Sequence, residues 1–97
     1  MTEMLAPIPP GEILLEEFLR PMGISQNRLA SDIDVPVSRI AGIVKGNRAI
    51  TTDTALRLAE YFGTTPDMWI NLQANYEFRL ARQSYWPEAR ERIRKLG

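Results

Sequence analysis

The sequence contains no cysteine and no histidine among its 97 residues. These absences exclude disulfides, thiol nucleophiles and histidine bases, and nearly all zinc sites also need one of the two side chains. The adjacent Glu16 and Glu17 do not provide a converging carboxylate pair, because neighbouring helix residues point about 100° apart. We therefore expect a protein that is not an enzyme and that holds no metal or other cofactor.

Long apolar runs are also missing. No stretch approaches the roughly 18 apolar residues that a membrane span requires. The opening residues MTEMLAPIPP lack both the basic start and the apolar centre of a signal peptide. A chain of 97 residues with 44% hydrophobic content has the size of one domain with one modest core. These features predict a cytoplasmic protein that does not enter a membrane.

The charged residues balance overall but are unevenly distributed. Twelve basic and twelve acidic residues give a net charge of zero, which by itself argues against a nucleic-acid-binding protein. Residues 1–34 hold six acids and two bases, whereas residues 35–60 hold four bases and two acids. Residues 79–97 are also basic, with six bases against two acids. The bases of the second block cluster around PVSRIAGIVKGNR at 36–48, which makes this stretch a candidate for contact with phosphates.

No stretch of four or more residues shows the apolar–polar alternation or the β-branched enrichment of a strand, so the sequence predicts an all-α fold. Helix-start and helix-stop residues place helices at about 10–22, 25–33, 36–45, 51–61 and 65–82, with a short sixth helix from Pro87. The expected N-caps are Ser25, Thr51 and Thr65, and the glycines expected to end helices are Gly23 and Gly46. In the first helix, Met22 is expected on a broad inward face, and Pro21 is expected to end or bend the helix.

The short helix at 36–45 has two unlike faces. The expected core face gathers Val37, Ile40, Ile43 and Val44, and the opposite face gathers Ser38, Ala41, Gly42 and Lys45. A glycine in a helix interior costs about 1 kcal/mol relative to alanine. Gly42 therefore suggests that the helix backbone closely approaches another surface. The alternative is an exposed glycine with no particular role.

Residues 25–40 have the spacing of a helix-turn-helix motif, with a short connection between two helices. In such a motif the amino end of the second helix contacts base edges in the major groove. Arg39 is suited to bidentate pairing with guanine, and Ser38 to a hydrogen bond with any base. Val37 is suited to contact with a thymine methyl, although it also fits the core.

Phosphate contacts are expected at both ends of the motif. Gln26 begins the first helix, where free backbone N–H groups favour a phosphate. Lys45, Asn47 and Arg48 follow the second helix and are expected along the phosphate backbone. The sequence therefore predicts double-stranded DNA as a partner, with contacts from Gln26, Val37, Ser38, Arg39, Lys45, Asn47 and Arg48.

The helix at 65–82 is apolar over too much of its circumference to pack on one partner. Its apolar residues span an arc of about 240°, whereas one-sided packing needs only about 100°. We therefore predict a dimer interface that includes Trp69, Ile70, Leu72, Tyr76, Phe78 and Leu80. A two-fold dimer also places two recognition helices about 34 Å apart, one turn of DNA. The alternative is a helix enclosed within its own domain, and the sector that forms the interface stays open.

The tail QSYWPEARERIRKLG at 83–97 combines two large aromatic residues with a basic segment. Docking onto the domain and extension of the dimer are the preferred interpretations. Contact with DNA phosphates and binding of a protein partner are the alternatives, and nothing in the sequence selects between them.

Several motifs resemble a known family. VPVSRI, IVKGNRAIT, TALRLAEYFGT and PDMWINLQ resemble the Xre/Cro-type (lambda-repressor-like) helix-turn-helix repressors. Together with PPGEILLEEFL, they make the chain similar to the HigA antitoxins, also called virulence-associated protein I, over about residues 8–82. Pro36 is a departure, because many Xre proteins have Ser or Thr there as a hydrogen-bonding N-cap.

The resemblance implies a five-helix DNA-binding domain at 1–82, with its dimerisation helix at 65–82, and a short C-terminal helical extension at 83–97. It also implies a homodimer that binds a palindromic operator in its own promoter and neutralises a small HigB-like RNase toxin. Two alternatives remain at this point. One is a transcriptional repressor with no toxin partner, and the other is a protein-binding adaptor that does not bind DNA.

Overall fold

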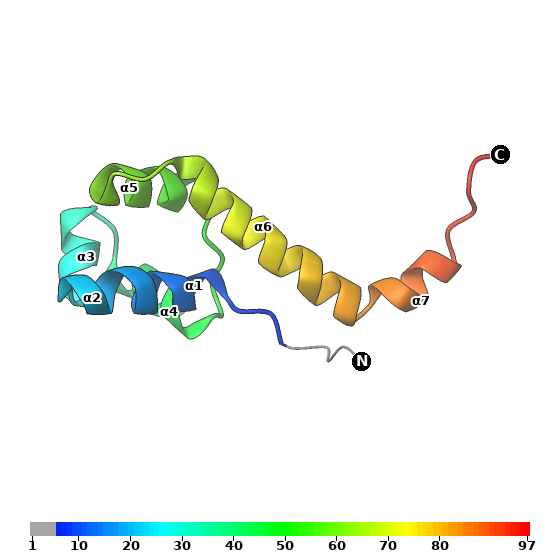
Figure 1. The fold of residues 1–97 in the computed structure, drawn as a ribbon, viewed down its shortest axis with the longest axis horizontal. Coiled ribbons are helices and arrows are strands. Elements are labelled where there is room, and N and C mark those ends of the chain that lie inside the picture. Colours follow the sequence, from blue (N-terminus) through cyan, green and yellow to red (C-terminus); the bar gives the residue numbers. More distant parts are fainter. Residues whose placement is uncertain (1–5) are drawn as a thin grey trace.

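The computed structural model describes residues 6–97, and every regular element in that range is helical, as expected (Figure 1). The helices are α1 (Pro10–Ile13), η1 (Leu14–Leu19), α2 (Arg20–Met22), α3 (Gln26–Asp32), α4 (Val37–Lys45), α5 (Thr52–Phe62), α6 (Pro66–Gln83) and α7 (Trp86–Glu91). Residues 1–5, which belong to the expected domain 1–82 and to the segment tested for a signal peptide, lie outside the described residues. Within residues 6–97, no helix is both long enough and apolar enough to cross a membrane.

The expected helix caps are confirmed. The hydroxyl oxygens of Ser25, Thr51 and Thr65 accept hydrogen bonds from the backbone N–H groups three residues later, at 3.0, 3.4 and 3.3 Å. Gly23 and Gly46 end α2 and α4 in the left-handed region, with φ of 65° and 86°. The helix starts and stops were therefore predictable from local residues.

The first helix runs continuously from α1 through η1 to α2, and its middle is a π-helix. The N–H of Arg20 donates to the carbonyl of Leu15, five residues back rather than four. Pro21 follows directly, and a proline ring crowds the carbonyl four residues before it, so the wider turn relieves the crowding. The wider turn also brings Leu14 and Leu19, five residues apart, to the same buried side. Met22 was expected inward, but it is 53% exposed beyond this turn.

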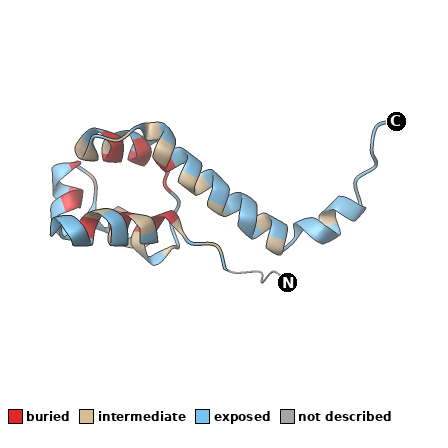
Figure 2. Cartoon of the chain, in the orientation of Figure 1, coloured by how far each residue is buried: buried red, intermediate tan, exposed pale blue. Residues whose placement is uncertain are grey.

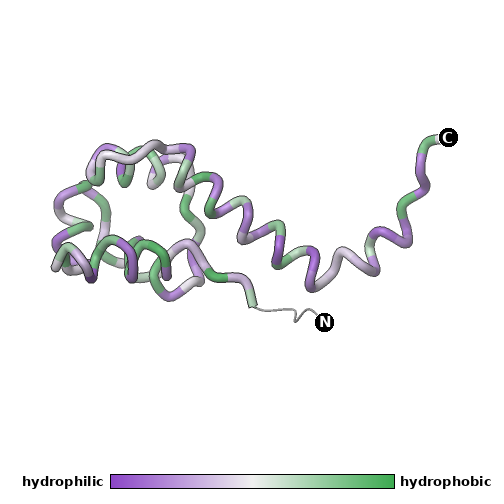
Figure 3. The backbone as a smooth tube through the Cα atoms, in the orientation of Figure 1, coloured by the Kyte–Doolittle hydropathy of each residue, from purple (hydrophilic) through white to green (hydrophobic). Residues whose placement is uncertain are grey.

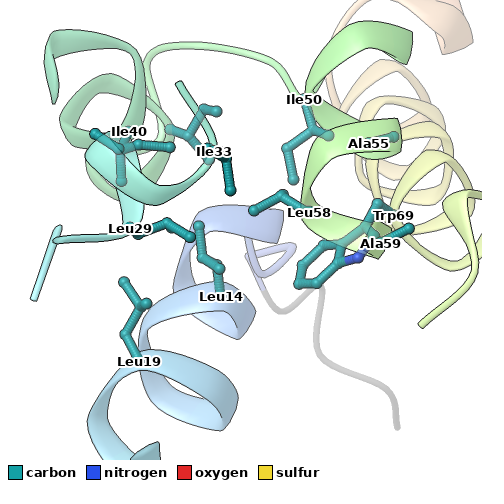
Figure 4. Close-up of a cluster of buried hydrophobic side chains, with 12 residues drawn as sticks. Leu14, Leu19, Leu29, Ile33, Ile40, Ile50, Ala55, Leu58, Ala59 and Trp69 are labelled. Carbon is teal, nitrogen blue, oxygen red and sulfur yellow. The ribbon is translucent and has the colours of Figure 1, made fainter. Parts of the chain in front are cut away.

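Side chains from the first helix to the start of α6 meet in one core (Figures 2 and 4). Its buried members are Leu14, Leu19, Leu29, Ala30, Ile33, Ile40, Ile43, Ile50, Ala55, Leu58, Ala59 and Trp69. The core therefore fixes both helices of the expected DNA-binding motif, α3 and α4, against the first helix and α5.

Trp69 corrects one sequence prediction. It was expected at the dimer interface, but its side chain is fully buried in the core of its own domain, where Figure 4 shows it beside Leu58. Its Nε1 donates a 2.9 Å hydrogen bond to the hydroxyl oxygen of Thr64. The centroid of its ring lies 5.0 Å from that of the Phe18 ring. Leu72, also expected at the interface, is half-buried against the same core. The reason is that the first turns of α6 pack on α5 and α1.

The second half of α6 leaves the domain as a projecting arm, and α7 continues beyond it (Figure 1). Exposed residues dominate this arm (Figure 2), and hydrophobic residues recur along it between hydrophilic ones (Figure 3). Ile70, Phe78 and Leu80 are 37%, 57% and 40% exposed. Ile70 and Phe78 lie in one apolar sector of α6, which the domain itself leaves uncovered. Leu80 lies about 160° around the helix from Phe78, in the sector of Trp69 and Tyr76.

Gly11 sets how closely the first helix approaches α4. A β-carbon at this position would overlap the carbonyl oxygen of Ile43 and lie 2.8 Å from the Cα of Val44. The two helices therefore touch backbone to backbone, which only glycine permits. The Pro-Pro-Gly opening thus supports α4 on the side of the first helix, a role that is not evident from the sequence.

Candidate nucleic-acid interface

The two helices of the candidate motif, α3 and α4, pack directly on each other. The turn between them is tight: Val35 donates from its N–H to the carbonyl of Ala30 at 3.0 Å. Asp34 takes a left-handed conformation with φ of 61°, which is uncommon for a residue other than glycine. Pro36 occupies the N-cap of α4 and makes no side-chain hydrogen bond there. The geometry is that of a helix-turn-helix with an uncapped second helix.

The amino end of α4 is open to a partner. Val37 is 45% exposed, and Ser38 beside it is also exposed. Val37 had been placed on the core face of the helix, and this is wrong, because the core is already filled there by Ile40 and Ile43. The side of α4 expected to contact bases thus presents a small apolar group and a hydroxyl.

Gly42 has a different role from the one expected. A β-carbon there would lie 3.1 Å from the Cβ of Arg48 and 3.3 Å from the Oδ1 of Asn47. The space beside Gly42 is therefore filled by the loop that follows α4, and the expected close approach of another surface at this residue is wrong. The loop folds back because Gly46 reverses the chain, and Asn47 then donates from its N–H to the carbonyl of Gly42 at 3.1 Å.

Three polar residues emerge at this end of α4. Lys45, Asn47 and Arg48 are all exposed. Neither Lys45 nor Arg48 forms an ion pair with any residue between 6 and 97. Neither charge is therefore held by a carboxylate of the described residues, which leaves both cations available for a phosphate contact. Gln26, at the start of α3, is half-buried, and its phosphate contact stays a prediction.

Arg39 is held by a partner that the sequence analysis did not pair with it. Its Nη1 lies 2.7 Å from Oδ2 of Asp53, in the first turn of α5, and its side chain is only 27% exposed. Asp53 in turn accepts from Nε of Arg57 at 3.1 and 3.0 Å. The spacing of Asp53 and Arg57, four residues apart on one helix, was a usable signal for the second pair but not for the first.

Arg57 extends this network to the turn of the motif. Its Nη1 donates to the backbone carbonyls of Ile33 at 2.8 Å and Asp34 at 3.3 Å. The Arg39 guanidinium, and after it that of Arg57, hold the pKa of the Asp53 carboxyl below its usual value of 3.8. Its ionised form is therefore favoured by folding, and this contribution to stability is present above 3.8 and lost as the pH falls further.

The loop after α4 is also tied to α6. The buried residue Ile50 donates from its N–H to Oε1 of Gln73 on α6 at 2.9 Å. The amide of Gln73 donates in turn to Glu77 at 2.8 Å. One helix, α6, thus positions the loop of expected phosphate contacts and carries the uncovered apolar sector.

Of the six residues expected at the dimer interface, the structure keeps four available. Ile70, Phe78 and Leu80 are exposed and Tyr76 is half-buried. Tyr85 and Trp86, 64% and 39% exposed, lie beside Phe78 along a groove between α6 and α7. The guanidinium of Arg82 lies 4.6 Å from the centre of the Phe78 ring. Phe78, Tyr85 and Trp86 form one aromatic surface on the arm, with Arg82 against it.

Known proteins are similar to this chain in fold and in sequence. A helix-turn-helix family profile matches residues 15–69. Virulence-associated protein I of Dichelobacter nodosus is 51% identical over 76 residues, which cover 78% of this chain and 70% of that protein. Antitoxin HigA-1 of Vibrio cholerae is 34% identical over 84 residues, 87% of this chain and 79% of that one. The structure of Pseudomonas aeruginosa antitoxin HigA with the higBA promoter superposes with a TM-score of 0.89 at 37% identity, and the match covers 94% of this chain and 99% of that one.

The sequence motifs, the geometry of α3 and α4 and these similarities agree over most of the chain. They also agree with the sequence-based expectation of an Xre-type domain. The chain belongs to the Xre-type helix-turn-helix family, among the HigA antitoxins and the proteins named virulence-associated protein I.

Proposed function

We propose that the chain is a DNA-binding antitoxin that represses its own operon as a homodimer and neutralises a HigB-like RNase toxin. The observation that carries the DNA-binding role is the surface of α4 and its following loop, where exposed Val37 and Ser38 are followed by the unpaired cations Lys45 and Arg48. The promoter in the structure of the related Pseudomonas aeruginosa HigA supports this role. The proposal includes no catalytic step and no cofactor, and a protein that binds an operator acts in the cytoplasm, where the DNA is.

The homodimer is supported by the aromatic surface of the α6–α7 arm. Phe78 and Tyr85 are large apolar residues of this surface that their own domain does not cover, and Leu80 is an exposed apolar residue on another face of α6. A two-fold dimer through this surface buries Phe78 and Tyr85 and presents two copies of α4 to a palindrome, with half-sites about one DNA turn, 34 Å, apart. Ile70 and Tyr76 complete the proposed interface, whereas Trp69 and Leu72 belong to the core.

Base contacts and phosphate contacts are expected to respond differently to substitution. Arg39→Ala should lower operator affinity by about 1–3 kcal/mol and relax the preference for one base. Arg48→Ala should weaken binding to all sequences alike and reduce the salt dependence by about one phosphate contact. Fluorescence anisotropy with operator duplexes that carry single base changes separates the two effects. If both variants lose affinity uniformly, Arg39 contacts a phosphate and not a base.

The antitoxin role is tested with the reading frame that neighbours this gene. Inducing that frame alone should arrest growth and cleave messenger RNA, and co-expression of the chain should restore growth and yield a stoichiometric complex. The double variant Arg39→Ala, Arg48→Ala is the matched control, because it should lose repression and still neutralise the toxin. Growth arrest that persists despite a folded, co-expressed chain would contradict the antitoxin role.

A further inference from the structure

The ion pair between Arg39 and Asp53 lies inside the proposed DNA interface. A small cleft of about 140 Å³ is lined by residues of α4, the following loop and the start of α5: Arg39, Arg48, Ala49, Thr51, Asp53 and Thr54. Asp53 thus shares this cleft with one cation proposed to contact a base and another proposed to contact phosphates. Among residues 6–97, it is the only acid that lines the cleft. An acid at this place repels DNA, so its presence needs a compensating role.

The carboxylate of Asp53 is fixed from both sides. Arg57 binds both of its oxygens, and Arg57 is itself anchored to the carbonyls of Ile33 and Asp34 in the turn. Exposed ion pairs contribute little to stability, partly because two long side chains must be ordered together. Here the carboxylate is already ordered, so Arg39 alone loses freedom when the pair forms. The effect of the pair is therefore mainly on the orientation of Arg39.

The orientation matters because a guanidinium can pair equally well with phosphates and with guanine. Arginine has five N–H donors, and the 2.7 Å contact with Asp53 uses one of them, on Nη1. Enough donors remain for the two acceptors of a guanine edge. A free arginine would instead reach any nearby phosphate, which raises the affinity for all sequences. The fixed carboxylate disfavours that alternative by its own repulsion of phosphates.

We propose that Asp53 is a positioning residue that determines sequence specificity, because it orients Arg39 toward a base edge and disfavours its pairing with phosphates. This inference rests on the proposed DNA-binding function. The alternative is an inhibitory ion pair, in which Arg39 must leave Asp53 before it can contact DNA. If the pair were inhibitory, substitution of Asp53 would tighten binding to the operator. If Asp53 positions Arg39, its substitution tightens binding to unrelated DNA.

The test compares Asp53→Ala and Asp53→Asn with the wild type. Kd is measured for a duplex from upstream of the gene and for a scrambled duplex of equal length, at the same salt concentration. The ratio of the two Kd values should fall about tenfold in Asp53→Ala, the size of a lost base contact. Asp53→Asn should lie between, because its amide oxygen still accepts from Arg39. Glu60→Ala is the matched control: it removes one acid from the same helix, at a residue lining a different groove, and should leave the ratio unchanged.

A second set of variants separates an effect on the orientation of Arg39 from an effect on the stability of the fold. In an Arg39→Ala background, Asp53→Ala should not change the ratio further, because the group that Asp53 orients is gone. A general loss of folding would lower both affinities by the same factor and leave the ratio intact. The inference would be overturned if Asp53→Ala left the ratio unchanged or raised the operator affinity. It would also be overturned if Asp53→Ala had an equal effect in the Arg39→Ala background. If the wild type itself does not distinguish the two duplexes, the proposed DNA-binding function fails, and the inference fails with it.

Discussion

Gly11→Ala is expected to destabilise the domain by about 3 kcal/mol or more, at or above the upper end of the usual range for overpacking. The added methyl would overlap the carbonyl oxygen of Ile43 and lie 2.8 Å from the Cα of Val44. Both are backbone atoms, so no side-chain rotation relieves the overlap, and the first helix must separate from α4. A domain of this size is stable by only about 5–15 kcal/mol. The free energy of unfolding is measured by urea titration followed by circular dichroism.

Gly23→Ala is the matched control for this prediction. Gly23 has a positive φ of 65°, but no atom lies within 4 Å of an added β-carbon. Its substitution therefore causes backbone strain without overlap, at a cost of about 1–2 kcal/mol. A Gly11→Ala loss no larger than that of Gly23→Ala would show that the first helix does not contact α4 this closely. Operator binding should fall with Gly11→Ala even where the protein is folded, because α4 loses its support.

Phe78→Asp is expected to convert the protein to a monomer and to weaken operator binding by about 100-fold or more. Phe78 is 57% exposed on the projecting half of α6, so the change should leave the fold of the domain intact. It places a charge in the proposed apolar interface, where burying a carboxylate is costly even beside the Arg82 guanidinium. A monomer binds one half-site at a time and loses the gain of linked binding, which is typically about 10²–10⁴-fold. Analytical ultracentrifugation at micromolar concentration measures the first effect, and anisotropy measures the second.

Asn71→Asp provides the comparison for Phe78→Asp. It introduces the same charge on the same helix, at an exposed polar residue two turns before Phe78. This variant should remain dimeric and should bind the operator nearly as well as the wild type. If Phe78→Asp also remains dimeric, the uncovered sector of α6 is not the dimer interface. The far-UV circular dichroism spectra of both variants should match that of the wild type, which excludes a general loss of structure.

Local signals were sufficient to predict the helices and their ends. The caps at Ser25, Thr51 and Thr65 and the glycines after the helices act within three or four residues, so the sequence contains the whole interaction. The π-helix at Leu14–Leu19 was not predicted, because the apolar pattern fits an ordinary helix until the crowding by the following proline is considered.

The helical projection of α6 shows which residues share a face but not which element covers that face. Its apolar arc is wider than the part that the domain covers, yet Trp69 was assigned to the dimer interface and not to the core, because the docking of α6 on α5 is a tertiary choice. The same limit applies to Gly42, where the covering group is the stem of Arg48 six residues later.

The candidate DNA site was predictable in its residue types but not in its internal contacts. The exposure of Ser38, Lys45 and Arg48 follows from the helix-turn-helix arrangement, whereas Val37 had been placed on the core face. The pair between Arg39 and Asp53 joins two helices across 14 residues, and no spacing rule relates them. Such contacts depend on how α4 and α5 pack, which the core decides.

The central claim is that α4 and its following loop bind the operator of this operon as two symmetric copies. A hydroxyl-radical footprint of the DNA upstream of the gene tests it most directly. The account predicts two protected blocks related by a two-fold symmetric sequence, with centres about 10–10.5 base pairs or a multiple of this apart. Protection should disappear in Arg48→Ala before it disappears in the wild type as the salt concentration is raised. Uniform protection along the duplex, or none at concentrations where the protein is dimeric, would contradict the account.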